Sequence, residues 1–426
     1  MKVTELKSTL LGGAYDQRLA YIYGEAAVSA QKERYAHAID CFIELYGTER
    51  EAALYSVAGR SELAGNHTDH NRGAVIAASI DLDIIAVAAP TEENVIRVKS
   101  EGFDEDVVDI TEYTAPRAIT EGHSDDLIAG VAAGFLANGY AIGGFVAYTT
   151  SNVLKGSGIS SSAAFENMIG NILSHLYNGG RVDNVEIAKI SQYAENAFFH
   201  KPCGLMDQVA CAVGGIVGID FADPKAPVIE KLDFDFSAAG YNLCIVNTGG
   251  NHADLTDDYA SVPTEMKAVA KFLGKEVLRE TDEAAVIAAI PALRAAVGDR
   301  AILRALHFFA ENKRVKTMTE ALRNGDTSAF FAGVLASGRS SFCYLQNVYT
   351  TKNLTEQGLS LALRLAEGVL ADKPAAWRVH GGGFAGTIQA FVPSANVEEF
   401  RSVMDAAFGD GCCMVLRIRP VGAVQI

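Results

Sequence analysis

The chain has 426 residues, and its 36 basic and 52 acidic side chains give a formal net charge of −16. A chain of this length with 49% hydrophobic and 21% charged residues can bury a sizeable core, which excludes a largely disordered protein. The acidic balance argues against nucleic acid or an anionic membrane as partner, because both require a basic surface.

We also expect neither a membrane span nor a secretory signal. No apolar run reaches the roughly 18 residues that span a bilayer, and the best candidate, residues 75–90, is interrupted by Asp81 and Asp83. The N-terminus has no long apolar core of the kind found in secretory signals. The seven cysteines are scattered without a CxxC pair, which favours reduced thiols over disulfides or a zinc site. We therefore expect a cytoplasmic protein.

Helical and strand-like hydrophobic patterns follow one another along the chain. Helices are predicted over the first 50 residues and over 124–138, 158–178, 185–198, 263–335 and 355–371. Strands are predicted over 74–90, 144–153, 242–247, 413–420 and, in two pieces around a glycine turn, 376–393. Because strands and helices mix without strict alternation, the pattern predicts an α+β fold rather than a doubly wound one. We expect two domains, 1–220 and 221–426, although no flexible linker marks the boundary.

A first candidate site is the segment KGSGISSSAA at residues 155–164, between a predicted strand and a predicted helix. Its glycines allow successive backbone N–H groups to converge on a phosphate at a helix N-terminus, and its serines can cap that helix. Lys155 adds positive charge. A plain helix cap after a tight turn would give the same pattern, and the common P-loop motif is absent.

Three further segments concentrate polar residues or glycines. Residues 59–73 (GRSELAGNHTDHNRG) are expected to form one polar loop suited to a polyhydroxylated ligand; a solvated loop or a metal site at its histidines is the alternative. In residues 202–208 (PCGLMDQ), the carboxylate of Asp207 among apolar neighbours is either functional or a helix cap, and Cys203 has no evident base to activate it. Residues 380–386 (HGGGFAG) form either a bare hairpin or a turn that approaches a ligand closely.

Taken in their order along the chain, the four segments resemble the motifs of the GHMP small-molecule kinases, and among them the galactokinase group. They resemble, respectively, the ATP-binding motif (155–164), the sugar-binding signature (59–73), the catalytic-aspartate motif (202–208) and the C-terminal glycine motif (380–386). The resemblance implies two α+β domains, with mixed sheets flanked by helices and an active-site cleft between them. It also implies a sugar 1-kinase that uses ATP and Mg²⁺ to convert galactose to α-galactose 1-phosphate and ADP, most simply as a monomer.

The resemblance assigns roles to individual residues. Asp207 would accept the proton of the anomeric hydroxyl, and Arg60 would lie against both this aspartate and the transferring phosphoryl group. The remaining implied contacts are to the sugar (Asn66, His67, Asp69, Gly204, Tyr259), to ATP (Lys155, Gly156, Ser157, Gly158, Ile159, Ser160, Ser161, Ser162, Gly381, Gly382, Gly383) and to Mg²⁺ (Ser162, Glu195). These roles suit phosphoryl transfer, which depends on positioning and charge neutralisation.

Three positions depart from the galactokinase pattern. Asn66 stands where that group has an acidic residue toward the sugar's C6 hydroxyl, Glu62 replaces an asparagine, and His70 replaces a tyrosine. The HxDH pattern is similar to galacturonokinases, and an amide can donate to a uronate that a carboxylate would repel. An amide also binds a plain hydroxyl, so galactose, galacturonate and other hexoses stay open. A non-enzymatic galactose and ATP sensor, or a mevalonate-type kinase, is a further alternative.

Overall fold

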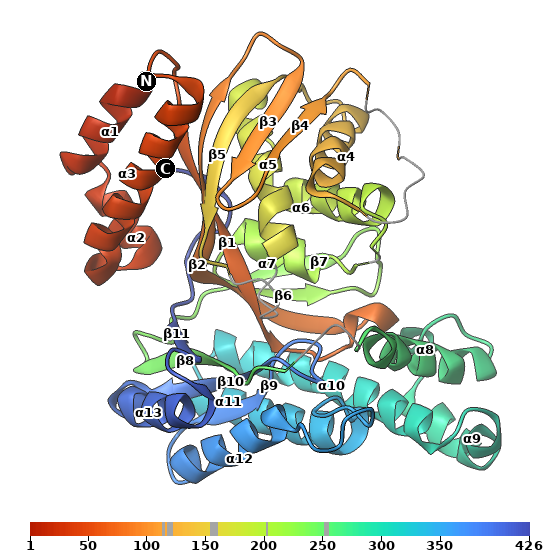
Figure 1. Ribbon diagram of the computed structural model, residues 1–426. Helices are drawn as coiled ribbons and strands as arrows, with labels where there is room; N and C mark the ends of the chain where they lie inside the picture. The colour runs from red at the N-terminus through yellow and green to blue at the C-terminus, as the bar shows by residue number, and fades with distance from the viewer. Residues whose placement is uncertain (113–115, 117–121, 154–160, 202, 251–254) are drawn as a thin grey trace.

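Figure 1 shows the computed structural model, which describes residues 1–112, 116, 122–153, 161–201, 203–250 and 255–426. The larger sheet has the strand order β12-β1-β2-β5-β3-β4, and β6 and β7 extend it beside β2. It is mixed, because β3 and β5 pair in parallel whereas β2 pairs antiparallel with β1, β5 and β6. Its strands are β1 (Ala53–Ala64), β2 (Ala74–Pro90), β3 (Val95–Ser100), β4 (Glu105–Asp109), β5 (Phe145–Ser151), β6 (Ile216–Asp220), β7 (Val228–Leu232) and β12 (Val424–Gln425).

Helices cover both faces of this sheet. One face carries α1 (Val3–Leu11), α2 (Asp16–Tyr23) and α3 (Val28–Tyr46); the other carries α4 (Ser124–Ala137), α5 (Ser161–Asn178), α6 (Asn184–Tyr193) and α7 (Met206–Val213). Alternate residues of β2 therefore pack in opposite directions: Ile85, Val87 and Ala89 toward the first set, Ile84, Ala86 and Ala88 toward the second. Apart from Ser79, Asp81 and Asp83, β2 is apolar on both faces, as is typical of a strand that is covered on both sides.

The smaller sheet is antiparallel, in the order β11-β8-β10-β9. Its strands are β8 (Tyr241–Asn247), β9 (Ala376–Val379), β10 (Thr387–Pro393) and β11 (Cys413–Leu416). Leu243 and Ile245 pack toward α10 (Asp299–Arg323) and α11 (Thr327–Ser340), whereas Cys244 and Val246 pack toward α12 (Gly358–Leu370) and α13 (Val397–Phe408). Helices α8 (Thr256–Phe272) and α9 (Glu283–Ala296) extend this lobe to one side (Figure 1).

The two sheets meet along the second half of β1. Gln389 of β10 donates from Nε2 to the carbonyl of Leu63 at 3.3 Å, and Ser61 Oγ lies 3.1 Å from Nε2 of His380. The chain also returns at its C-terminal end, where β12 pairs with β1 in the larger sheet (Figure 1). The lobes are therefore joined by buried polar contacts as well as by the chain itself.

The α+β prediction and most predicted elements are confirmed. The prediction of one polar loop over 59–73 was wrong for its first part: residues 59–64 are the buried end of β1, because two sheets enclose it. The helix predicted over 185–198 is α6 followed by a π turn over Ala194–Phe198, and the strand over 413–420 ends at Leu416. The boundary at residue 220 stays a prediction; β7 and β12 lie beyond it and pair within the larger sheet. No described helix is long and apolar enough to cross a bilayer.

Candidate active site

The loop between β1 and β2 lies against the glycine turn of the smaller sheet. His67 has a left-handed backbone (φ 59°), and its Nε2 is 2.9 Å from the carbonyl of Gly382. Burial lowers the pKa of His67, so a neutral ring that donates Nε2–H to this carbonyl is favoured. Tyr259 of α8 donates its hydroxyl to the carbonyl of Gly383 at 2.9 Å. The sugar signature and the C-terminal glycine motif, more than 300 residues apart, thus form one wall.

Glycines permit two close approaches in this region. A Cβ at Gly204 would lie 2.7 Å from Oδ2 of Asp69, and a Cβ at Gly382 would lie 2.6 Å from the ring of Tyr259. Both distances are shorter than real Cβ contacts. Of the predicted sugar contacts, His67, Asp69, Gly204 and Tyr259 therefore do gather at the junction of the lobes.

Arg60 and Asp207 form a bidentate ion pair beside this wall. Nε and Nη2 of Arg60, on β1, donate to Oδ1 and Oδ2 of Asp207 at 2.8 and 2.7 Å. Burial alone would lower the pKa of Arg60, but the charge and hydrogen bonds of Asp207, together with smaller contributions from Cys211 and Glu62, outweigh it and the pKa is raised. Asp207 lies in the first turn of α7, where the helix dipole favours a carboxylate, and its side chain is 33% exposed against 10% for Arg60. The pair therefore holds a carboxylate that stays partly exposed.

Ser162 and Glu195 meet next to this pair. Ser162 Oγ, at the start of α5, donates to Oε1 of Glu195 at 3.1 Å, and Gln208 Nε2 donates to Oε2 at 2.8 Å. Glu195 lies in the π turn after α6, an irregularity that is frequent at functional sites, and its side chain is 3% exposed. One hydroxyl and one carboxylate suit Mg²⁺, which usually keeps a few protein oxygens together with substrate phosphates. Within the described part of the chain, no cluster of three or more His, Cys, Asp or Glu side chains could hold a metal ion.

Sequence reasoning missed two neighbours of Glu195. Lys201 places its Nζ 2.8 Å from Oε1 of Glu195, and the only signal in the sequence is a lysine directly before the PCGLMDQ motif. Glu166, four residues after Ser162 on α5, is fully buried and accepts from Gln208 at 3.3 Å; its other oxygen has no partner among the described residues. Burial raises the pKa of Glu166, and the charge of Glu195 raises it further, so its carboxyl favours the protonated form.

The amide of Asn66 is fully engaged by protein groups. Its Nδ2 donates to the carbonyl of Gly381 at 2.7 Å and to Glu62 at 3.2 Å. Its Oδ1 accepts from Asn347 at 2.8 Å and from Ser341 at 3.2 Å. Asn66 is also fully buried, so the sugar contact predicted for it would require one of these bonds to be exchanged.

A hollow of about 570 Å³ adjoins Ser161 and Ser162. Its apolar lining comes largely from Phe103, Leu127, Phe165 and Phe199, which suits the flat face of a purine base. The predicted phosphate contacts Lys155, Gly156, Ser157, Gly158, Ile159 and Ser160 lie outside the described residues.

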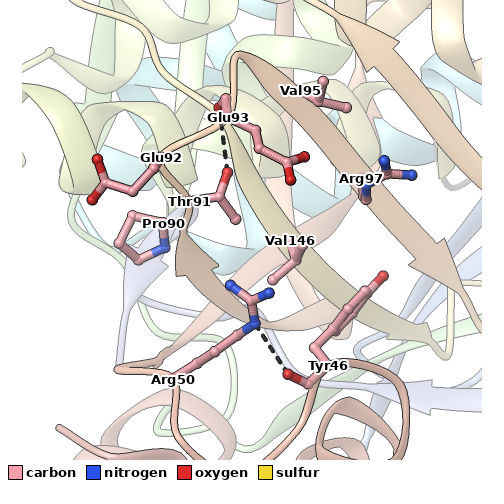
Figure 2. A pocket seen from close by; sticks show the side chains of 9 residues that line it. All are labelled: Tyr46, Arg50, Pro90, Thr91, Glu92, Glu93, Val95, Arg97 and Val146. Atoms are coloured by element: carbon pink, nitrogen blue, oxygen red, sulfur yellow. Dashed lines mark hydrogen bonds between the residues drawn. The ribbon is translucent and has the colours of Figure 1, made fainter.

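A second hollow, of about 480 Å³, lies on the larger lobe and is shown in Figure 2. Arg50 and Arg97 line it together with Glu92 and Glu93, and it contains none of the motif residues. Two arginines and two glutamates line it, so this hollow carries no excess of either charge. The candidate site is therefore the junction of the lobes rather than this groove.

Comparison with known proteins agrees with this location. The family model "GHMP kinases N terminal domain" matches residues 126–215, and "Galactokinase galactose-binding signature" matches residues 40–90. A galactokinase of Streptomyces coelicolor is 30% identical over 393 residues, which are 90% of this chain and 94% of that protein. The chain belongs to the galactokinase family. Its predicted membership of the GHMP kinases, drawn from four motifs, is thereby confirmed.

Solved structures of two kinases share the fold. A Lactococcus lactis galactokinase solved with galactose is 23% identical, with a TM-score of 0.76 over 92% of this chain and 100% of that one. A mevalonate kinase is 14% identical, with a TM-score of 0.60 over 86% and 99% of the two chains. The galactokinase family and the mevalonate kinase fold therefore share this two-sheet arrangement.

Proposed function

We propose that the protein is an ATP-dependent galactokinase, which transfers the γ-phosphoryl group of ATP to the anomeric hydroxyl of galactose. The observation that carries this is the bidentate pair of Arg60 and Asp207 at the junction of the lobes, in a chain of the galactokinase family. The sugar would lie between Asp207 and the wall formed by His67, Asp69 and Tyr259. The apolar hollow beside Ser161 and Ser162 would receive the adenine of ATP.

In this proposal Asp207 accepts the proton of the anomeric hydroxyl while that oxygen attacks the γ-phosphorus and ADP leaves. The charge of Arg60 fixes the carboxylate and lies where negative charge develops on the transferring group. A general base of this kind is commonly worth about 10²–10⁴-fold in rate. Gly381, Gly382 and Gly383 would close the phosphate side with backbone groups.

Ser162 and Glu195 would hold Mg²⁺ between them and the phosphates. When bound, the ion would neutralise charge on the β- and γ-phosphates. Their positions support this role, because the two oxygens already face each other and Gln208 fixes the second oxygen of Glu195.

The test is ADP release from Mg-ATP with galactose, galacturonate, glucose, N-acetylgalactosamine and arabinose, compared side by side on the purified chain. Fast turnover with galactose and weak turnover with galacturonate is the expected result. Preference for galacturonate would replace galactose as the substrate in this proposal. Galactose binding without turnover on any sugar would make the protein a sensor and refute the kinase.

A further inference from the structure

Lys201 is held in place by two contacts with one residue. Its backbone N–H donates to the carbonyl of Glu195 at 3.1 Å, and its Nζ donates to Oε1 of the same residue at 2.8 Å. The residue before it, His200, adopts a left-handed backbone (φ 57°), which is costly for a non-glycine residue. The turn after the π helix therefore directs this ammonium group at Glu195.

The ammonium shares its acceptor with Ser162. Both Lys201 Nζ and Ser162 Oγ donate to Oε1 of Glu195, and Gln208 Nε2 donates to Oε2. A divalent ion held by Ser162 and Glu195 would use this same carboxylate oxygen. It would therefore displace the ammonium group or lie close to it, and two cations at such short range repel each other strongly.

The side chain of Lys201 is far more exposed than that of the residue it contacts. Its side chain is 57% exposed, whereas that of Glu195 is 3% exposed. Moving the ammonium group aside leaves no buried hole, but it does leave a cation without its carboxylate. Nucleotide phosphates that arrive together with the metal supply a new anionic partner, which a free metal ion does not.

We propose that the ammonium group of Lys201 occupies the metal site while no nucleotide is bound. It prevents a free divalent ion from binding to Glu195, and it moves aside for the ion that arrives with the nucleotide. This inference rests on the proposed function, in which Ser162 and Glu195 are the metal ligands. Lys201 is thus a positioning residue that keeps Glu195 in place before the substrate binds.

The experiment is a titration of the nucleotide-free full-length protein with Mn²⁺ alone, in which free Mn²⁺ is followed by electron paramagnetic resonance. Lys201→Met removes the charge and keeps most of the length of the side chain, and Lys201→Arg keeps the charge. We expect Lys201→Met to bind Mn²⁺ at least about tenfold more tightly than the native protein, because the competing charge is gone. Lys201→Arg should stay near the native value. Lys201→Gln repeats the neutral case if the methionine variant does not fold.

The double variant Lys201→Met with Glu195→Gln locates the effect and should lose the gain. Equal Mn²⁺ affinity of Lys201→Met and the native protein, including no detectable binding by either, would overturn the inference. A gain that survives Glu195→Gln would also overturn it, because the ion would then bind elsewhere. Sugar-dependent ADP release by the native protein is measured in parallel. Turnover without a gain in Mn²⁺ affinity refutes the inference alone, whereas a Glu195-dependent gain without turnover refutes the proposed kinase alone.

Discussion

Removing the charge of Glu62 should destabilise the junction between the lobes. Arg378, on β9, is fully buried and donates to Glu62 of β1; its Nη1 also donates to Ser337 at 2.8 Å. The next carboxylate, that of Glu311, is 3.9 Å from the guanidinium. Glu62→Gln keeps an oxygen that can accept from Arg378, but it leaves the carboxylate of Glu311 as the nearest negative charge.

Breaking a buried ion pair by changing one partner typically costs about 3–5 kcal/mol. Because Glu311 remains within 4 Å, we expect about 3 kcal/mol for Glu62→Gln, a large part of the roughly 5–15 kcal/mol that stabilises a typical domain. The assay is urea unfolding followed by circular dichroism. The matched control is Glu49→Gln, which removes an exposed glutamate paired with Lys2 and should leave the midpoint unchanged. Equal midpoints for the two variants would refute the reasoning that this pair joins the lobes.

Three further outcomes follow from the site and the core. Asp207→Asn should lower sugar-dependent ADP release by about 10²-fold or more while nucleotide binding, measured by calorimetry, is retained; near-native turnover would remove Asp207 from the role of base. Gly204→Ala should raise KM for the sugar without changing the affinity for ATP, because the new methyl group would lie 2.7 Å from Asp69 Oδ2; an unchanged KM would contradict this. Burial raises the pKa of Asp81 to about 6, above its unfolded value of 3.8, so this group binds more protons in the folded state and its contribution to stability should fall as pH rises between these values. Asp81→Asn should therefore stabilise the protein at pH 7 by about 1–3 kcal/mol and flatten this part of its stability profile, and identical profiles in urea unfolding would refute this.

The sequence predicted the elements whose patterns are local. The strand predicted over 74–90 and the helix predicted over 158–178 are β2 and α5, because both patterns depend only on neighbouring residues. The strand β1 was missed as a whole: no strand was predicted over residues 53–58, and Arg60 and Glu62 look like loop residues until their partners are known. Those partners, Asp207 for Arg60 and Arg378 for Glu62, are 147 and 316 residues away along the chain. No local sequence pattern predicts a contact at that separation.

The candidate site was predictable to the extent that it resembles the family. The resemblance pointed to Arg60, Asp207, Ser162 and Glu195, and the structure brings Arg60 to Asp207 and Ser162 to Glu195. Lys201 was passed over because a single lysine in an irregular turn is usually a surface residue. Its two contacts with Glu195 distinguish Lys201 from an ordinary surface lysine.

The exchange at positions 62 and 66 shows why substrate preference does not follow from the sequence alone. Compared with the galactokinase pattern, the neutral Asn66 looks like the loss of a carboxylate that faces the sugar. In the structure a carboxylate is present four residues earlier, at Glu62, where it pairs with Arg378 and accepts from Asn66 itself. A glutamate restored at 66 would face the carbonyl of Gly381, where Asn66 now donates, as well as the charge of Glu62, and it would disturb both. The two substitutions therefore act as a pair. The contacts of Asn66 with its protein neighbours explain why this residue is neutral, without any change in the sugar that is bound.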